Sequence, residues 1–201
     1  RRISSAASDV YKRQSERFNT EVLIVGTGIS GLLAAIKLAE RYSVTILSKS
    51  SLSDCSTAWA QGGIAAVIDN EDNINNHIKD TINNGHKICN TNSVQQIIKQ
   101  GKDSIELLLN YGVNFNKKGK VLDQTLEGGH SHRRIVYHND NTGEEIHSSL
   151  LREARKRKNI IIKENIMVID MIGKKENYCE GVYAYDKRNN NVVSIKANII
   201  I

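Results

Sequence analysis

The sequence contains no proline among its 201 residues. Average usage of about 5% would give about ten prolines. Asparagine, isoleucine and lysine are abundant at the same time. We therefore attribute the missing proline to codon usage in an A/T-rich genome and not to a structural constraint.

Cysteine is scarce, and long apolar runs are missing. The three cysteines, Cys55, Cys89 and Cys179, lie far apart and form no CxxC pair, which argues against a cysteine zinc site and a disulfide framework and predicts free thiols in a reducing compartment. No apolar run approaches the ~20 residues that span a bilayer, and no apolar stretch follows the basic start as in a signal peptide. We expect no membrane span and a cytoplasmic location.

The chain also has little excess of charge, since the formal net charge is +6. Residues 1–14 hold four basic residues against one acidic residue and show no hydrophobic periodicity. We expect them to be a non-native or disordered leader. The remaining charge is too small to predict a nucleic-acid partner. Residues 15–201 are predicted to form the N-terminal part of one globular domain.

Hydrophobic patterning predicts a βαβ unit near the start. Residues 21–25 (EVLIV) form a buried-strand pattern that ends at Gly26. Residues 28–42 have helical spacing and residues 43–48 form a second strand. This order is a βαβ unit, which is typical of an α/β fold.

Further elements follow along the chain. After a small-residue loop, we expect helices over 72–84, over 93–111 (interrupted at Gly101) and over 142–158, the second capped by Ser93 and the last by a Thr142–Glu145 capping box. Strands are expected over 160–163, 166–172, 182–185 and 192–201, with an antiparallel hairpin turning at Asn189–Asn191. Because the last strand is followed by nothing, we expect the domain to be incomplete.

The first motif is a GxGxxG between the first strand and the helix. It comprises Gly26, Thr27, Gly28, Ile29, Ser30 and Gly31. The three glycines suit a tight turn, approach to a pyrophosphate, and close packing of helix on strand, while the helix N-terminus attracts the phosphates. The alternative is a glycine-rich turn with no ligand. The motif does not separate NAD from FAD. Lys49 stands where an acidic residue usually binds the adenine ribose. Lys49 could donate a hydrogen bond to the nucleotide or be an ordinary solvated lysine.

The second motif is a dense run of small residues. It contains Ser56, Thr57, Ala58, Trp59, Ala60, Gln61, Gly62 and Gly63. Such a segment can lie flat against a planar ligand, and Gly62 and Gly63 permit unusual dihedrals and close approach. By itself it is only a candidate binding loop.

The third motif is EGGHSHRR, which begins at Glu127 and ends at Arg134. His130 and His132 lack the further ligands that a metal site needs, so we expect no metal. A polar site for an anionic substrate is the favoured interpretation, and a solvated basic loop is the alternative.

With these three motifs the sequence resembles the L-aspartate oxidases, within the fumarate reductase and succinate dehydrogenase flavoprotein superfamily. The segments STxxAQGGIAAV, LLLNYGVNF and EGGHSHRR carry the resemblance, which extends from about residue 21 to the last residue. It implies a Rossmann-like, doubly wound FAD-binding domain interrupted by a capping domain. It also implies oxidation of L-aspartate to iminoaspartate, with oxygen or fumarate as acceptor, and transfer of iminoaspartate to quinolinate synthase in de novo NAD synthesis.

The resemblance also implies roles for single residues. Residues 27–30 would hold the pyrophosphate, Lys49 matches a lysine of the family, and residues 56–63 would line the flavin. Glu127 would orient the substrate by pairing with its ammonium group. Ser56 stands where many succinate and fumarate enzymes carry the histidine that attaches FAD, so FAD is expected to be noncovalent.

Two other functions stay open on the sequence. One is a succinate or fumarate flavoprotein subunit, and the other is a non-catalytic FAD-binding module. The capping domain and the family's substrate-binding arginines and histidines would follow Ile201, so this chain by itself is expected to be inactive.

Overall fold

The computed structural model describes residues 17–173 and 178–201. The expected leader over 1–14 lies outside the described residues. The chain forms two compact units, one from the described residues up to Ser56 together with those from Leu151 onward, and the other from Thr57–Leu150. Within the described ranges, no helix combines the length and the apolar character needed to cross a membrane.

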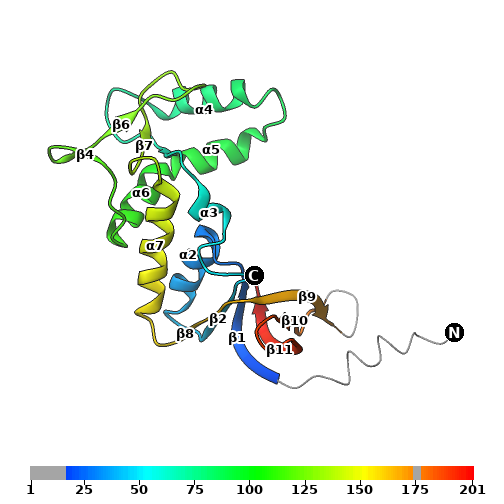
Figure 1. The fold of residues 1–201 in the computed structure, drawn as a ribbon. Coiled ribbons are helices and arrows are strands. Elements are labelled where there is room, and N and C mark those ends of the chain that lie inside the picture. Colours follow the sequence, from blue (N-terminus) through cyan, green and yellow to red (C-terminus); the bar gives the residue numbers. More distant parts are fainter. Residues whose placement is uncertain (1–16, 174–177) are drawn as a thin grey trace. The chain divides into compact units, whose positions relative to one another are not determined.

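The first unit is built on a six-stranded sheet (Figure 1). Its strand order is β8-β2-β1-β11-β10-β9. The bounds are β8 (Ile160–Lys163), β2 (Val44–Leu47), β1 (Arg17–Val25), β11 (Asn191–Ile200), β10 (Gly181–Asp186) and β9 (Ile166–Ile172). The first four strands are parallel to one another and the last two pairings are antiparallel. The predicted α/β fold with an antiparallel region near the C-terminus is confirmed.

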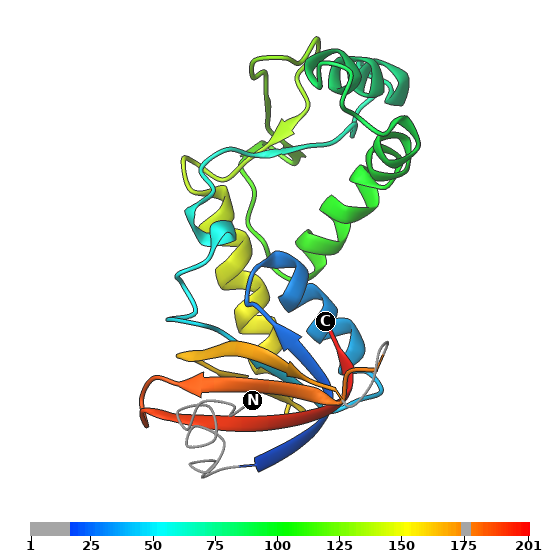
Figure 2. The ribbon, with the colours of Figure 1, turned by 90° about the vertical axis from the view of Figure 1, so that its right-hand side faces the viewer.

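Strand β1 begins four residues earlier than the sequence pattern indicates. Arg17, Phe18, Asn19 and Thr20 pair with Ser194–Ala197 of β11. This pairing is long-range, so the local pattern contains no signal for it. Helix α2 (Ile29–Leu38) follows β1 and buries Leu32, Ala35 and Ile36. Figure 2 shows α2 lying along the sheet of this unit.

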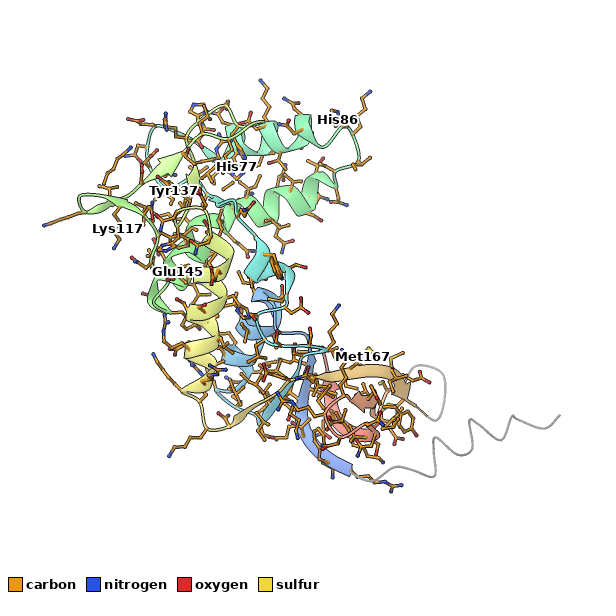
Figure 3. The ribbon with its side chains drawn as sticks, in the orientation of Figure 1. His77, His86, Lys117, Tyr137, Glu145 and Met167 are labelled. Atoms are coloured by element: carbon orange, nitrogen blue, oxygen red, sulfur yellow. The ribbon has the colours of Figure 1, made fainter. Side chains whose placement is uncertain are left out.

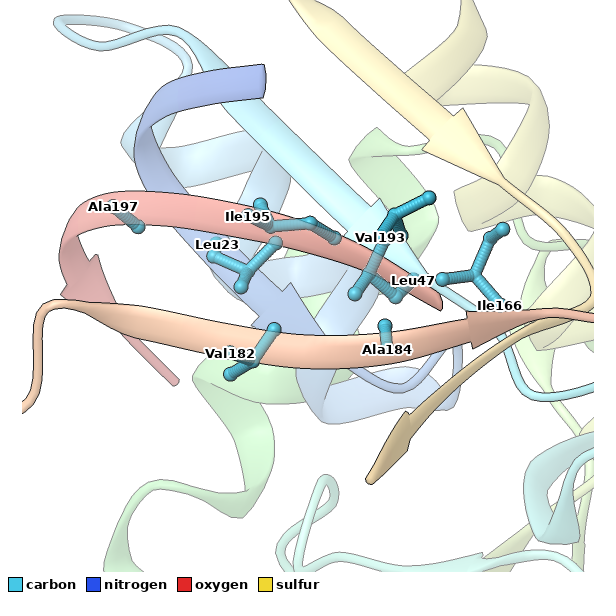
Figure 4. Packing of buried hydrophobic residues seen from close by; sticks show 8 residues of the cluster. All are labelled: Leu23, Leu47, Ile166, Val182, Ala184, Val193, Ile195 and Ala197. Atoms are coloured by element: carbon cyan, nitrogen blue, oxygen red, sulfur yellow. The ribbon is translucent and has the colours of Figure 1, made fainter. Parts of the chain in front are cut away.

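One hydrophobic cluster of the first unit lies on one face of this sheet (Figure 4). Side chains from five strands meet there, namely Leu23, Leu47, Ile166, Val182, Ala184, Val193, Ile195 and Ala197. Burying each larger aliphatic side chain contributes about 1.5–3 kcal/mol. The core therefore fixes the carboxyl ends of β1 and β2, which carry the first motif and Lys49.

The predicted hairpin turn after β10 is present. Asn190 adopts a left-handed φ of +52°, which asparagine tolerates better than most residues. The Asp186 carboxylate accepts the N–H groups of Arg188 and Asn189 at 2.8 and 3.1 Å. These bonds satisfy backbone donors that the tight turn leaves unpaired.

The second unit combines short strands with four longer helices. The short helix α3 (Ser56–Trp59) leads into it. Its strands form an antiparallel three-stranded sheet of β3 (Ile64–Ala65), β7 (Ile135–Val136) and β6 (Gln124–Thr125), and a separate hairpin of β4 (Lys117–Lys118) and β5 (Val121–Leu122). Its helices are α4 (Ile74–Asn84), α5 (Thr91–Lys99), α6 (Gly101–Asn110) and the first part of α7 (Thr142–Arg155).

Two predicted helix caps are wrong. The residue that caps α5 is Asn90, whose side chain accepts the N–H of Ser93 at 3.0 Å. Thr142 accepts the N–H of His138, and the Glu145 carboxylate accepts the N–H of Asn114 and the hydroxyl of Ser149. Glu145 is thus used by a loop distant in sequence, which a local motif cannot reveal.

The predicted helix break is present, but one predicted helix end is wrong. The expected interruption at Gly101 is present, since α5 ends at Lys99 and α6 begins at Gly101. Helix α7 ends at Arg155, before the expected Lys158.

Candidate functional site

The turn after β1 requires glycine at its first position. Gly26 has a φ of +120°, which an L side chain rarely adopts. Its N–H donates to the carbonyl of Leu47 at 2.9 Å, so the turn is tied to the end of β2. Gly28 is the N-cap of α2, with extended backbone angles, and its carbonyl accepts the N–H of Leu32 at 3.0 Å.

Gly31 brings the first turn of α2 against this turn. A Cβ at Gly31 would lie 2.2 Å from the carbonyl oxygen of Gly26 and 3.4 Å from Cγ2 of Ile24. No residue with a side chain fits there without moving the backbone. The close packing of helix on strand expected from the third glycine is therefore present.

The start of α2 suits an anion. Gly28 makes no side-chain cap hydrogen bond, and the first turn holds no acidic residue. The positive end of the helix dipole is not neutralised by a nearby carboxylate. The buried Thr27 donates to the Ser48 hydroxyl at 3.4 Å, which joins the ends of β1 and β2, and the exposed Lys49 follows.

In the second unit, the small-residue segment rests on the first turn of α7. The N–H of Gly143 donates to the carbonyl of Ala60 at 2.9 Å. A Cβ at Gly143 would lie 2.0 Å from the carbonyl oxygen of Thr57. Sequence reasoning missed Gly143, although a glycine within the first helical turn signals a close approach. Trp59 is 74% exposed, so this segment presents an open surface.

Gly62 and Gly63 differ in what they do. A Cβ at Gly63 would lie 2.4 Å from the carbonyl oxygen of Val136, so Gly63 allows close packing on β7. A Cβ at Gly62 would meet only Oε2 of Glu127, at 3.9 Å. Neither is among the positive-φ glycines of the described residues. The prediction of unusual dihedrals at these two glycines is thus wrong. Gly63 is instead required because the chain packs closely on β7 at this position.

A pocket of about 370 Å³ opens beside these glycines. It is lined by Gln61, Gly62, Gly63, Thr125, Glu127, Tyr137, Asn139 and Asp140. The structure therefore brings Glu127 of the third motif together with the Gln61–Gly63 end of the second. Tyr137, labelled in Figure 3, donates to the Asp123 carboxylate at 2.7 Å. This hydrogen bond raises the pKa of Tyr137, which keeps its hydroxyl protonated.

Sequence reasoning missed Thr125, Tyr137, Asn139 and Asp140 as pocket residues. They lie at the ends of two-residue strands or in the loop that follows. Such short strands have no periodicity that would predict which side chains share a face.

The last residue of EGGHSHRR is a buried structural anchor. Arg134 is 0% exposed and makes two hydrogen bonds to Asp72, at 2.6 and 3.0 Å, and one to Asp80 at 2.6 Å. Both of its carboxylate partners come from the same unit. The charge of Arg134 is therefore already paired inside the unit. For Arg134, both the predicted role in binding an anionic substrate and the alternative of a solvated loop residue are wrong.

The carboxylates around Arg134 are held in their charged form. Burial alone would raise the pKa of Asp80, but hydrogen bonds from the N–H of Ser131, from Arg134 and from the Ser131 hydroxyl lower it far below its ordinary value. Burial would likewise raise the pKa of Asp72, and the hydrogen bonds from Arg134 outweigh that effect. The buried charge of Arg134 is thus compensated by two carboxylates.

Two histidines lie beside this ion-pair cluster. The ring of His77, labelled in Figure 3, is 5.7 Å from that of His130. Burial lowers the pKa of His77, and the positive charge of Arg134 lowers it further. Among the described residues, no group of three or more histidine, cysteine, aspartate or glutamate side chains could hold a metal ion.

The predicted site residues are divided between the two units. Residues 26–31, Lys49 and Ser56 belong to the first unit, and residues 57–63 and Glu127 belong to the second. The first unit thus carries the glycine turn, and the second carries the pocket that Glu127 borders.

Comparison with known proteins places this geometry in a family. An L-aspartate oxidase of Acinetobacter baylyi is 39% identical over 188 residues, which cover 90% of this chain and 35% of that protein. An L-aspartate oxidase of Clostridium acetobutylicum is 37% identical over 183 residues, covering 90% of this chain and 41% of that protein. The chain thus spans well under half the length of these relatives.

A solved structure shows the same fold. A quinol fumarate reductase of E. coli superposes with a TM-score of 0.86 at 24% identity, covering 92% of this chain and 32% of that one. The model of the FAD binding domain family matches residues 21–201, which include the glycine turn, the small-residue segment and the pocket. This chain belongs to the FAD binding domain family.

Proposed function

We propose that the intact protein oxidises L-aspartate to iminoaspartate with FAD as cofactor and with oxygen or fumarate as the final acceptor. Aspartate loses two electrons and two protons in this reaction, and oxygen takes them up as hydrogen peroxide or fumarate as succinate. The step would begin de novo NAD synthesis, with iminoaspartate passing to quinolinate synthase. The identities of 33–39% to L-aspartate oxidases over about nine-tenths of the chain support this assignment.

Several residues of the chain would hold FAD. Gly26, Gly28 and the first turn of α2 would hold the pyrophosphate, Lys49 would donate to the adenosine part, and residues 57–63 would lie against the flavin. Bound FAD would supply the two-electron acceptor. Ser56 has no imidazole to form a covalent link, so FAD would be held noncovalently. The three free cysteines fit a reducing compartment such as the cytoplasm.

One observation carries the choice of substrate. The Glu127 carboxylate borders the pocket beside Gly62, in the segment proposed to lie against the flavin. Aspartate differs from succinate by an ammonium group, and a carboxylate at this place can accept a charge-assisted hydrogen bond from it. Glu127 would thereby fix which hydrogen of the substrate α-carbon faces the flavin.

The test is Glu127→Gln, which keeps the shape of the side chain and removes its charge. A charge-assisted hydrogen bond is worth about 1.5–3 kcal/mol. The efficiency kcat/KM of aspartate oxidation should therefore fall roughly ten- to two-hundred-fold. Fumarate reduction should change much less, because fumarate has no ammonium group.

The two alternatives give different results in the same assay. Equal losses in both reactions would assign Glu127 a general supporting role. Loss in neither, with turnover of succinate, would favour a succinate or fumarate flavoprotein. FAD binding without any turnover would favour a non-catalytic module.

A further inference from the structure

We propose that Asp80 and Asn84, one helical turn apart on α4, clamp the loop over residues 126–134 and so position Glu127 for its substrate. The inference rests on the proposed function, because it assigns to these two residues a part in aspartate selectivity. Both act through the loop and do not border the pocket, so they are positioning residues.

The loop needs external restraint. It joins β6, which ends at Thr125, to β7, which begins at Ile135. Glu127, Gly128 and Gly129 are exposed, and a Cβ at Gly128 would meet nothing within 4 Å. Two adjacent glycines lose more conformational entropy than other residues when they are fixed. Contacts with another element are therefore needed to hold Glu127 in one place.

Asp80 supplies the first contact. Its Oδ2 atom accepts the N–H of Ser131 at 2.8 Å, the hydroxyl of Ser131 at 2.7 Å and Nη1 of Arg134 at 2.6 Å. The same carboxylate oxygen thus binds the loop and the buried arginine at its end. Since Asp72 takes the remaining side of Arg134, the arginine is fixed from two directions and Asp80 is fixed with it.

Asn84 supplies the second contact. Its Nδ2 donates to the carbonyl of Gly129 at 2.8 Å and to the carbonyl of Asp80 at 2.8 Å. Gly129 has a φ of +84°, and a Cβ there would lie 2.9 Å from the Asn84 amide. Residues four apart lie on the same helix face, so one face of α4 holds the loop at both Gly129 and Ser131.

These anchors lie two to four residues from Glu127. The N–H of His130 also donates to the carbonyl of Glu127 at 3.2 Å, which joins the clamped part of the loop to Glu127 itself. Loosening the clamp should let the Glu127 carboxylate move away from the substrate's ammonium group. A substrate without an ammonium group should be affected much less.

The test uses two variants that keep the ion pair between Arg134 and its carboxylates. Asn84→Ala removes the bonds to the carbonyls of Gly129 and Asp80. Ser131→Ala removes the hydroxyl bond to Asp80 and the hydroxyl contact with Nδ1 of His132. The matched control is Asn83→Ala, because Asn83 is an exposed neighbour on α4. In the intact flavoprotein, kcat/KM for aspartate oxidation and for fumarate reduction is measured with flavin content and the melting temperature. Amide hydrogen exchange over residues 128–131 is followed in parallel.

If the clamp positions Glu127, its variants should lose aspartate oxidation selectively. Asn84→Ala and Ser131→Ala should lower kcat/KM for aspartate by roughly tenfold, as expected for the weakening of one hydrogen bond, and should change fumarate reduction less than ~threefold. Amide exchange over 128–131 should be faster in both variants and unchanged in Asn83→Ala. Equal losses in both reactions, or no loss, would overturn the inference.

The failure of the clamp can be separated from that of the proposed function. If the wild-type protein does not turn over aspartate, the proposed function fails and aspartate positioning fails with it. If wild type is active but exchange over 128–131 is the same in all variants, the clamp alone is wrong.

Discussion

Gly31→Ala tests whether the turn after β1 is built to hold FAD. The added Cβ would lie 2.2 Å from the Gly26 carbonyl oxygen, where ordinary contact begins near 3.4 Å. The start of α2 and the turn must therefore separate by about 1 Å, since overpacking of this kind is relieved by backbone shifts. A shift of ~1 Å lengthens a hydrogen bond of ~2.9 Å beyond its useful range.

The expected magnitude follows from the loss of one such bond. A hydrogen bond to a charged phosphate is worth about 1.5–3 kcal/mol, so the Kd for FAD should rise roughly ten- to two-hundred-fold. The assay is titration of the intact apoprotein with FAD, followed by the change in flavin fluorescence. Gly128→Ala is the matched control, because a Cβ there would meet nothing within 4 Å. A Kd for Gly31→Ala within ~threefold of wild type, with normal folding, would refute the assignment of this turn to FAD.

Two further predictions concern cofactor attachment and acid stability. Acid precipitation of the intact holoprotein should release all of its flavin, because Ser56 cannot form a covalent link, and flavin retained in the pellet would count against this. The second unit should lose stability in two steps as pH falls in a urea-unfolding series. The first step occurs below about pH 6.5. The pKa of His77 is lower in the folded chain than in the unfolded chain, so the unfolded chain takes up a proton first as the pH falls. The second step occurs below about pH 3.8. The pKa values of Asp72 and Asp80 are lower in the folded chain, so these carboxylates are protonated first in the unfolded chain. Asp72→Asn should abolish part of the second step. It should cost about 1.5–3 kcal/mol, the worth of a charge-assisted hydrogen bond, because Asp80 still pairs with Arg134. A cost below ~1 kcal/mol would contradict the ion pair between Asp72 and Arg134.

The sequence predicts the first unit better than the second, for a physical reason. The βαβ start and the hairpin near Asn190 depend on local patterns, apolar periodicity and turn residues, which the sequence displays directly. The extension of β1 to Arg17 depends on pairing with β11, whose residues lie more than 170 positions away. Local periodicity contains no information on such a partner.

The candidate site shows the same division. Glycine spacing predicts the close approach at Gly31, because the motif and its reason are local. The burial of Arg134 could not be predicted from the sequence, since Asp72 and Asp80 precede it by 62 and 54 residues. Nothing in the local sequence distinguishes these two residues from ordinary surface acidic residues in or just before a helix. The corrected capping box at Thr142 has the same origin, since Glu145 binds Asn114, 31 residues away.

Anaerobic reduction of the flavin shows whether aspartate is the electron donor. The purified intact holoprotein is mixed with L-aspartate or with succinate in the absence of oxygen and fumarate, and the visible absorption of the flavin is recorded. We predict that aspartate bleaches the flavin, that succinate does not, and that admitted oxygen restores the colour. Bleaching by succinate and not by aspartate, or by neither, would contradict this prediction.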